Sequence, residues 1–136
     1  MDDHSIPARP LDQLLQLLAD AAHVLILPHN DPDPDAIASA LGLRYLLGQR
    51  LGLDAQVAYQ GIIGRAENKA LVRYLGRPLR QLAEVDLRRA THLILVDTQS
   101  GAGNNPLPAG RIPAVIMDHH AWRAEIGPDA LRGRAT

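Results

Sequence analysis

A chain of 136 residues, 46% of them hydrophobic, is long enough for one domain with its own core and too short for two ordinary domains. Because the chain has no Phe, one Trp and three Tyr, that core must be aliphatic. The absence of cysteine excludes disulfides and thiolate metal sites and suits a reducing compartment. A formal net charge of −1 gives no electrostatic basis for binding long nucleic acids, and there is no signal peptide or apolar run of about 20 residues, so we expect a cytoplasmic protein with no membrane partner.

A helix and then a strand are predicted at the start of the chain. Apolar residues between Leu11 and Ala22 recur at the spacing of an amphipathic helix, and Pro10 suits its first position. Residues 24 to 27 form a continuous apolar run, which is typical of a strand buried on both faces of a parallel sheet.

The densest cluster of metal-ligand residues follows this strand, in the sequence His29-Asn-Asp-Pro-Asp33-Pro-Asp35. Each proline favours extended geometry in the residue before it, so we expect Leu27, Asp31 and Asp33 to be extended and Asp33 and Asp35 to point to one side. One imidazole with several carboxylates suits Mn²⁺, Mg²⁺ or Zn²⁺. The competing interpretation is an acidic turn in which Asp35 only caps a helix.

The middle of the chain alternates helix and strand patterns. Residues 35 to 49 carry two apolar stripes, which predict a helix packed on a sheet, and residues 55 to 59 suit a second strand. Residues 66 to 76 are compatible with a helix, and another short helix is predicted at residues 78 to 89. Arg65 is a candidate for facing the site, although an exposed charge at a helix start is the simpler interpretation.

Two later strands also end in residues that bind metals. A strand at residues 91 to 96 is followed by Asp97, and a strand at residues 114 to 117 by residues 118 to 120; turns are expected at residues 101 to 110 between them. The carboxyl ends of parallel strands meet at one edge, so three strands bring ligands together and favour a metal site. The element order predicts a Rossmann-like open parallel α/β sheet with helices on both faces.

These residues resemble the DHH phosphoesterase family. The stretch from His29 to Ser39 is similar to its first motif, Val96-Asp97-Thr98 to its second, and Asp118-His119-His120 to the motif that names it. The nearest resemblance is to the branch of nanoRNases, pAp phosphatases and cyclic-di-AMP or linear dinucleotide phosphodiesterases. Their first motif usually reads Asn-Pro-Asp-Gly-Asp; here Asp31 stands for the Asn and Pro34 for the Gly.

The resemblance implies a site for two Mn²⁺ ions, for which Mg²⁺ or Co²⁺ are possible substitutes. His29 and Asp33 would bind one ion, Asp35 and His119 the other, and Asp97 would bridge the two. Such a pair of ions suits in-line displacement at phosphorus without a covalent nucleophile.

The resemblance also implies roles in substrate binding and catalysis. His120 would contact a substrate phosphate, with Arg65 as a further candidate, and Asp118 would orient a metal ligand. The expected activity is metal-dependent hydrolysis of short oligonucleotides, dinucleotides or nucleoside bisphosphates. The expected catalytic residues are Asp97, Asp118, His119 and His120.

The resemblance covers the amino-terminal part of such a phosphoesterase, which we assign to residues 1–136. Members of the family carry a fourth acidic ligand further along the chain and a second, substrate-binding domain with a glycine-rich motif. Neither is found here, and Glu125 and Asp129, the carboxylates after His120, lie too close to it to serve. We therefore expect a fragment that binds metal but has weak or no activity alone; its oligomeric state is left open, with a homodimer as one possibility.

Three other interpretations remain open. A haloacid-dehalogenase-like phosphatase would use Asp33 as a covalent nucleophile, but this leaves His29 and residues 118 to 120 unexplained. A pyrophosphatase or exopolyphosphatase of the same superfamily would use the same residues on another substrate. A non-catalytic metal- or nucleotide-binding module would bind ligand without turnover.

Overall fold

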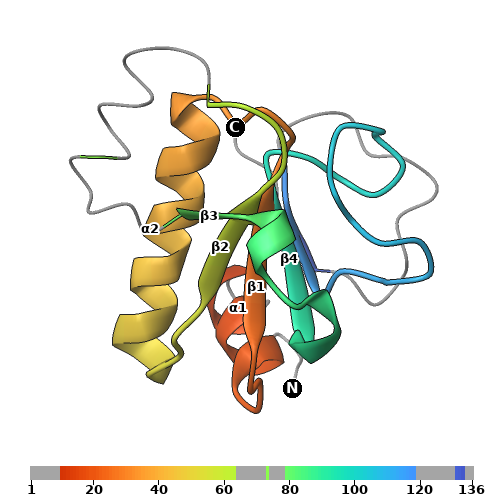
Figure 1. Ribbon diagram of the computed structural model, residues 1–136. Helices are drawn as coiled ribbons and strands as arrows, with labels where there is room; N and C mark the ends of the chain where they lie inside the picture. The colour runs from red at the N-terminus through yellow and green to blue at the C-terminus, as the bar shows by residue number, and fades with distance from the viewer. Residues whose placement is uncertain (1–9, 64–72, 74–78, 119–130, 134–136) are drawn as a thin grey trace, which may run out of the picture.

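The computed structural model describes residues 10–63, 73, 79–118 and 131–133 (Figure 1). Six described strands form one parallel sheet in the order β3-β2-β1-β4-β5-β6, which confirms the expected Rossmann-like α/β class. The strands are β1 Val24–Pro28, β2 Gln56–Tyr59, β3 Leu79–Gln81, β4 His92–Val96, β5 Val115–Met117 and β6 Leu131–Gly133. The helices are α1 Pro10–Leu18 and α2 Pro34–Leu51, with 3₁₀ helices η1 Leu82–Glu84 and η2 Leu87–Arg89.

The strand order reverses between β1 and β4. Strands β1 to β3 are added outward in one direction and β4 to β6 in the other, so β1 and β4 are neighbours in the middle of the sheet. They pair along their whole length, from Val24 with His92 to Pro28 with Val96. Open α/β sheets bind ligands beyond the carboxyl ends of the strands at such a reversal. The residues that follow Pro28 and Val96 therefore occupy the expected binding position.

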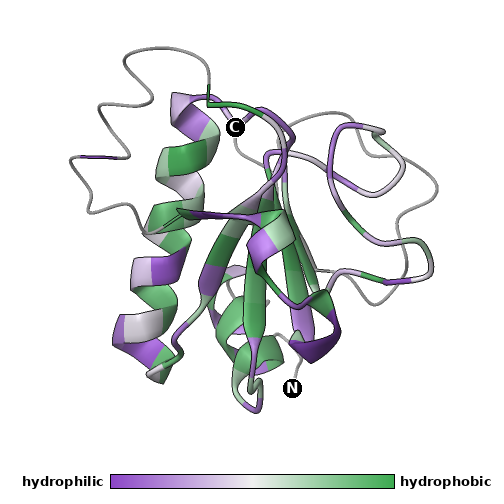
Figure 2. Ribbon diagram, in the orientation of Figure 1, coloured by the Kyte–Doolittle hydropathy of each residue, from purple (hydrophilic) through white to green (hydrophobic). Residues whose placement is uncertain are grey.

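Strand residues alternate between two apolar clusters, one on each face of the sheet. On one face, Val24 and Ile26 pack with α1 and α2. On the other, Leu25 and Leu27 pack with the segment that contains η1 and η2. Helical segments thus lie on both faces, as expected, although among the described residues both α-helices lie on the first face and the second carries the two 3₁₀ helices. The central strands are apolar while their ends are polar (Figures 1 and 2). No helix among the described residues is both long and apolar enough to cross a membrane.

Helix α2 begins one residue earlier than expected because Asp33 caps it. Asp33 is extended (φ −85°, ψ 174°), as predicted, and Pro34 occupies the first helical turn, where its missing N–H costs nothing. The expectation for Asp31 was wrong: its φ is +52° instead of extended. Asp tolerates this left-handed geometry, and bonds to the loop after β2, described below, hold it there.

The prediction of a helix at residues 78 to 89 is also wrong. Leu79 to Gln81 instead pairs with β2, and the two 3₁₀ helices follow. Polar side chains interrupt the segment, because Glu84 Oε1 accepts from the N–H of Gln81 at 3.2 Å and Asp86 Oδ1 accepts from the N–H of Arg88 at 3.1 Å. The helix expected at residues 66 to 76 lies almost entirely outside the described residues.

Candidate metal centre

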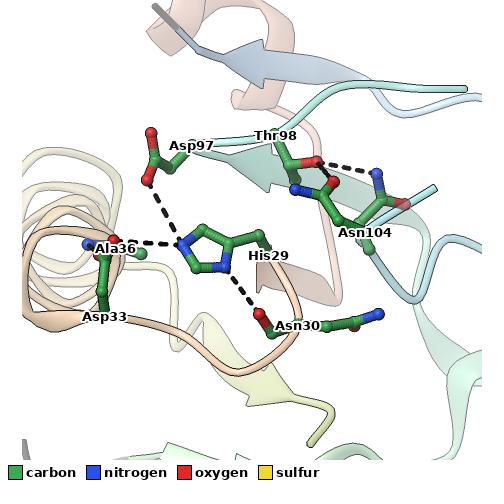
Figure 3. A network of polar contacts seen from close by, with 8 residues as sticks. His29, Asn30, Asp33, Ala36, Asp97, Thr98 and Asn104 are labelled. Atoms are coloured by element: carbon green, nitrogen blue, oxygen red, sulfur yellow. Dashed lines mark hydrogen bonds and ion pairs between the residues drawn. The ribbon is translucent and has the colours of Figure 1, made fainter. Parts of the chain in front are cut away.

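Three side chains from separate parts of the sequence meet beyond the ends of β1 and β4. His29 follows β1, Asp33 caps α2 and Asp97 follows β4, and one ligand atom from each lies within 4.8 Å of the others. His29 Nε2 is 3.6 Å from Asp33 Oδ2 and 3.6 Å from Asp97 Oδ2 (Figure 3). The structure thus brings together three of the five residues predicted to bind metal.

The imidazole of His29 is oriented by the backbone carbonyl of the next residue, Asn30. Its Nδ1 lies 2.7 Å from the carbonyl oxygen of Asn30. A carbonyl only accepts hydrogen bonds, so in the neutral ring Nδ1 carries the proton and Nε2 carries the lone pair. Nε2 is the atom that faces the two carboxylates (Figure 3). Histidines that bind metals commonly donate the other ring N–H to such a partner.

The three groups fit a divalent cation. An ion about 2.1 Å from each ligand atom separates adjacent ligand atoms by about 3.0 Å in an octahedron and about 3.4 Å in a tetrahedron. The two separations from His29 Nε2 are 3.6 Å, only slightly longer, and ligand atoms of the two carboxylates lie within 4.8 Å of each other. Two carboxylates and one imidazole make a mixed O and N set without sulfur, which suits Mn²⁺, Mg²⁺ or Zn²⁺. The half-exposed side chain of Asp33 leaves one side open to solvent.

Asp97 is held in a backbone conformation that L-residues rarely adopt. Its φ is +60°, and its N–H donates to the carbonyl oxygen of Met117 at 2.7 Å. This bond ties the end of β4 to the end of β5. Left-handed geometry at a non-glycine residue persists only where surrounding contacts impose it, and it is frequent at functional sites.

Asp33 serves the helix and the site with different oxygens. Its Oδ1 accepts from the N–H of Ala36 at 2.9 Å, and its Oδ2 faces His29. The competing interpretation placed a helix cap at Asp35, but the cap is Asp33. Asp35 is exposed in the first turn of α2 and does not belong to the three-residue group. Its role as a ligand of a second ion stays a prediction.

Asp31 is a structural residue of the loop rather than part of the three-residue group. Its Oδ1 accepts from the N–H of Ile62 at 2.6 Å, and its own N–H donates to Gln60 at 2.9 Å. The φ of Gly61 is +95°, and this residue packs directly on the Asp31 side chain. The loop after β2 therefore supports the loop that carries His29.

The loop after β4 contacts the same segment from the other side. Its Asn104 accepts from the N–H of Asn30 through its carbonyl oxygen, at 2.6 Å. The sequence predicted turns here but gave no signal for this contact. Two buried oxygens at these two loops, Asn30 Oδ1 and Ser100 Oγ, have no hydrogen-bond partner within the described residues.

Asp118, predicted to orient a ligand, is 4% exposed and accepts from the side chain of Gln99. Gln99 Nε2 lies 2.8 Å from Asp118 Oδ2, and Gln99 is 1% exposed. The sequence did not single out Gln99, because a glutamine two residues after a carboxylate has no distinctive pattern. His119, His120 and Arg65 lie outside the described residues, so their roles stay predictions.

Two comparisons with known proteins bear on this site. A family model described as the DHH family, N-terminal domain, matches residues 23–132. An uncharacterized protein of Methanocaldococcus jannaschii is 42% identical over 99 residues, which cover 73% of this chain and 20% of that protein. The chain thus matches about a fifth of the length of this relative.

Proposed function

Because the chain belongs to the DHH family, we propose that it carries the metal-binding part of a metal-dependent phosphoesterase that hydrolyses short oligonucleotides, dinucleotides or nucleoside bisphosphates. The observation that carries this proposal is the convergence of His29 Nε2 with the carboxylates of Asp33 and Asp97. Nothing in the fold alone would distinguish a phosphoesterase from other α/β proteins, so the argument depends on this group.

The three residues have separate tasks in the proposed reaction. Together they would hold a divalent cation, which would supply neutralisation of phosphate charge and a lowered pKa for a coordinated water. His29 supplies a neutral nitrogen ligand, Asp33 is accessible from solvent, and Asp97 lies between the ends of β1 and β5. The position of Asp97 supports its proposed role as the bridge between two Mn²⁺ ions.

The second ion and the substrate would be bound by the remaining predicted residues. Asp35 and His119 are the proposed ligands of the second ion, and His120 and Arg65 the proposed phosphate contacts. Asp118 would orient a neighbouring metal-binding residue. Its burial beside a hydrogen-bond donor, the side chain of Gln99, supports this positioning role.

Metal binding is the first test, by calorimetric titration of Mn²⁺ into this chain and into Asp97→Ala. Asp54→Ala is the matched control, because the Asp54 side chain is 99% exposed and is not part of the three-residue group. We expect the wild-type chain and Asp54→Ala to bind Mn²⁺ alike and Asp97→Ala to lose binding. A folded wild-type chain that binds no divalent cation would contradict the proposal.

The substrate class requires a second experiment, on the full-length Methanocaldococcus jannaschii relative, of which the matched region covers 20%. Dinucleotides, nucleoside bisphosphates, pyrophosphate and polyphosphate would be compared at saturating Mn²⁺. Preferred release of mononucleotide or of phosphate from a bisphosphate supports the proposal. Faster hydrolysis of pyrophosphate or polyphosphate would contradict it and support a pyrophosphatase or exopolyphosphatase. Binding of these compounds without any turnover would support a non-catalytic module.

A further inference from the structure

The ring of His29 is linked by hydrogen bonds to the loops that follow both neighbouring strands. Its Nδ1 donates to the carbonyl of Asn30 at 2.7 Å. The N–H of the same peptide unit, that of Asp31, donates to Gln60 at 2.9 Å, and the N–H of Asn30 donates to Asn104 at 2.6 Å. The segment that orients the imidazole is therefore fixed from the side of β2 and from the side of β4.

The link to the loop after β4 depends on three side chains, Thr98, Asn104 and Asn105, which we call the Thr98 clasp. Thr98 Oγ1 donates to Asn104 Oδ1 at 2.6 Å (Figure 3). The same oxygen accepts from Asn105 Nδ2 at 3.0 Å. Asn105 Nδ2 also donates to the carbonyl of Gln99 at 2.9 Å. Thr98 is 1% exposed, so water does not compete for its hydroxyl. The clasp thereby fixes where the backbone of Asn104 lies.

We propose that Thr98 and Asn104 are positioning residues for His29. By holding the Asn104 carbonyl on the N–H of Asn30, the clasp fixes the backbone that selects the ring tautomer with its lone pair on Nε2. The inference rests on the proposed function only where it assigns metal binding to Nε2. The tautomer itself can be measured in the metal-free chain. Hydrogen-bond partners of metal-binding histidines change metal affinity by about 10- to 100-fold; acting through one more residue, the clasp should change it by about three- to tenfold.

The first readout is the His29 tautomer in the metal-free 136-residue chain, from ¹⁵N-detected ring spectra at a pH where the imidazole is neutral. The His29 signals are assigned by their loss in His29→Gln. We expect the Nδ1–H tautomer in wild type and a mixture of tautomers in Thr98→Val, which keeps the shape of threonine without the hydroxyl. Thr98→Ser, which restores the hydroxyl, should behave as wild type.

A second variant separates the clasp from direct effects on Asp97, which is bonded to Thr98 in sequence. Asn104→Ala removes the acceptor of the Thr98 hydroxyl at an exposed residue, so the chain should fold. It should shift the tautomer as Thr98→Val does. Both variants should bind Mn²⁺ about three- to tenfold more weakly, and Thr98→Ser within about twofold of wild type.

The outcomes separate this inference from the proposed function. An unchanged tautomer in folded Thr98→Val and Asn104→Ala, or an Nε2–H tautomer in wild type, would overturn the positioning role. If the tautomer responds as expected but wild type binds no Mn²⁺, the clasp orients His29 and the metal proposal fails.

Discussion

The Asp31 carboxylate fills the space that a side chain at residue 61 would need. A Cβ atom added to Gly61 would overlap Asp31 Oδ1 and lie 2.8 Å from its Cγ and 3.0 Å from its backbone nitrogen. Gly61 also has a φ of +95°, which L-residues rarely adopt. The loops after β1 and β2 are therefore in direct contact only because residue 61 has no side chain.

We expect Gly61→Ala to lower the free energy of unfolding by about 2–4 kcal/mol, combining left-handed strain of about 1–2 kcal/mol with displacement of Asp31. Gly103→Ala is the control: its φ is +80° but a Cβ there meets nothing within 4 Å, so only strain of about 1–2 kcal/mol should remain. Urea unfolding measures both. If the two variants lose the same free energy of unfolding, the displacement of Asp31 does not contribute to the loss.

Asp31→Asn should leave stability within about 0.5 kcal/mol of wild type, because Asn keeps an oxygen for the N–H of Ile62 and tolerates positive φ. Asp31→Ala should cost about 1–3 kcal/mol, since it removes an exposed hydrogen bond worth about 0.5–1.5 kcal/mol and places alanine at a positive φ, which costs about 1–2 kcal/mol. Neither should change the number of Mn²⁺ ions bound by the chain in calorimetry. Loss of an ion in Asp31→Asn would make Asp31 a ligand and contradict its structural assignment.

Asp33 allows capping and metal binding to be separated. Asn is as good a helix cap as Asp, so Asp33→Asn should remain within about 0.5 kcal/mol of wild-type stability while its Mn²⁺ affinity falls about tenfold or more. Asp33→Ala should lose both, with about 0.5–2 kcal/mol lost from stability. Chemical unfolding and Mn²⁺ titration of the same samples test this. Unchanged affinity in Asp33→Asn would remove Asp33 from the site.

The buried pair of Gln99 and Asp118 predicts an order of stabilities. Gln99→Leu removes one donor from the Asp118 carboxylate and should cost about 1–3 kcal/mol. Gln99→Glu places a second carboxylate at that position and should cost more, about 3–5 kcal/mol at pH 7. Urea unfolding of the two variants side by side measures the difference. If Glu is tolerated as well as Leu, the two carboxyl groups share a proton in the folded chain.

The central sheet could be predicted from the sequence, and its edge could not. Strands β1 and β4 are continuous apolar runs, which only burial on both faces explains. Strand β3 has three residues, two of them exposed, so it leaves no pattern. The spacing of Leu79, Leu82 and Val85 suits one side of a helix, but here it arises from a short strand followed by 3₁₀ turns.

In the candidate site, too, some residues could be predicted from the sequence and others could not. His29, Asp33 and Asp97 could be predicted because each is a ligand-type side chain just after a strand or at a helix start. Asn104 acts on His29 through a backbone carbonyl, which every residue has, so its position depends on the folded loop. For Asp31, the preference of a residue before proline predicted extended geometry, and two hydrogen bonds to the next loop outweigh it.

The pairing of β1 with β4 has a consequence for folding kinetics. His23 and Thr91, at the amino ends of these strands, are hydrogen bonded across 68 residues of sequence. Parallel strands cannot pair through a hairpin, and contacts so distant in sequence form slowly. His29 and Asp97 meet only after this step, so an ion would find its ligands assembled only in the nearly native sheet. Bound Mn²⁺ should therefore slow unfolding and leave the folding rate almost unchanged.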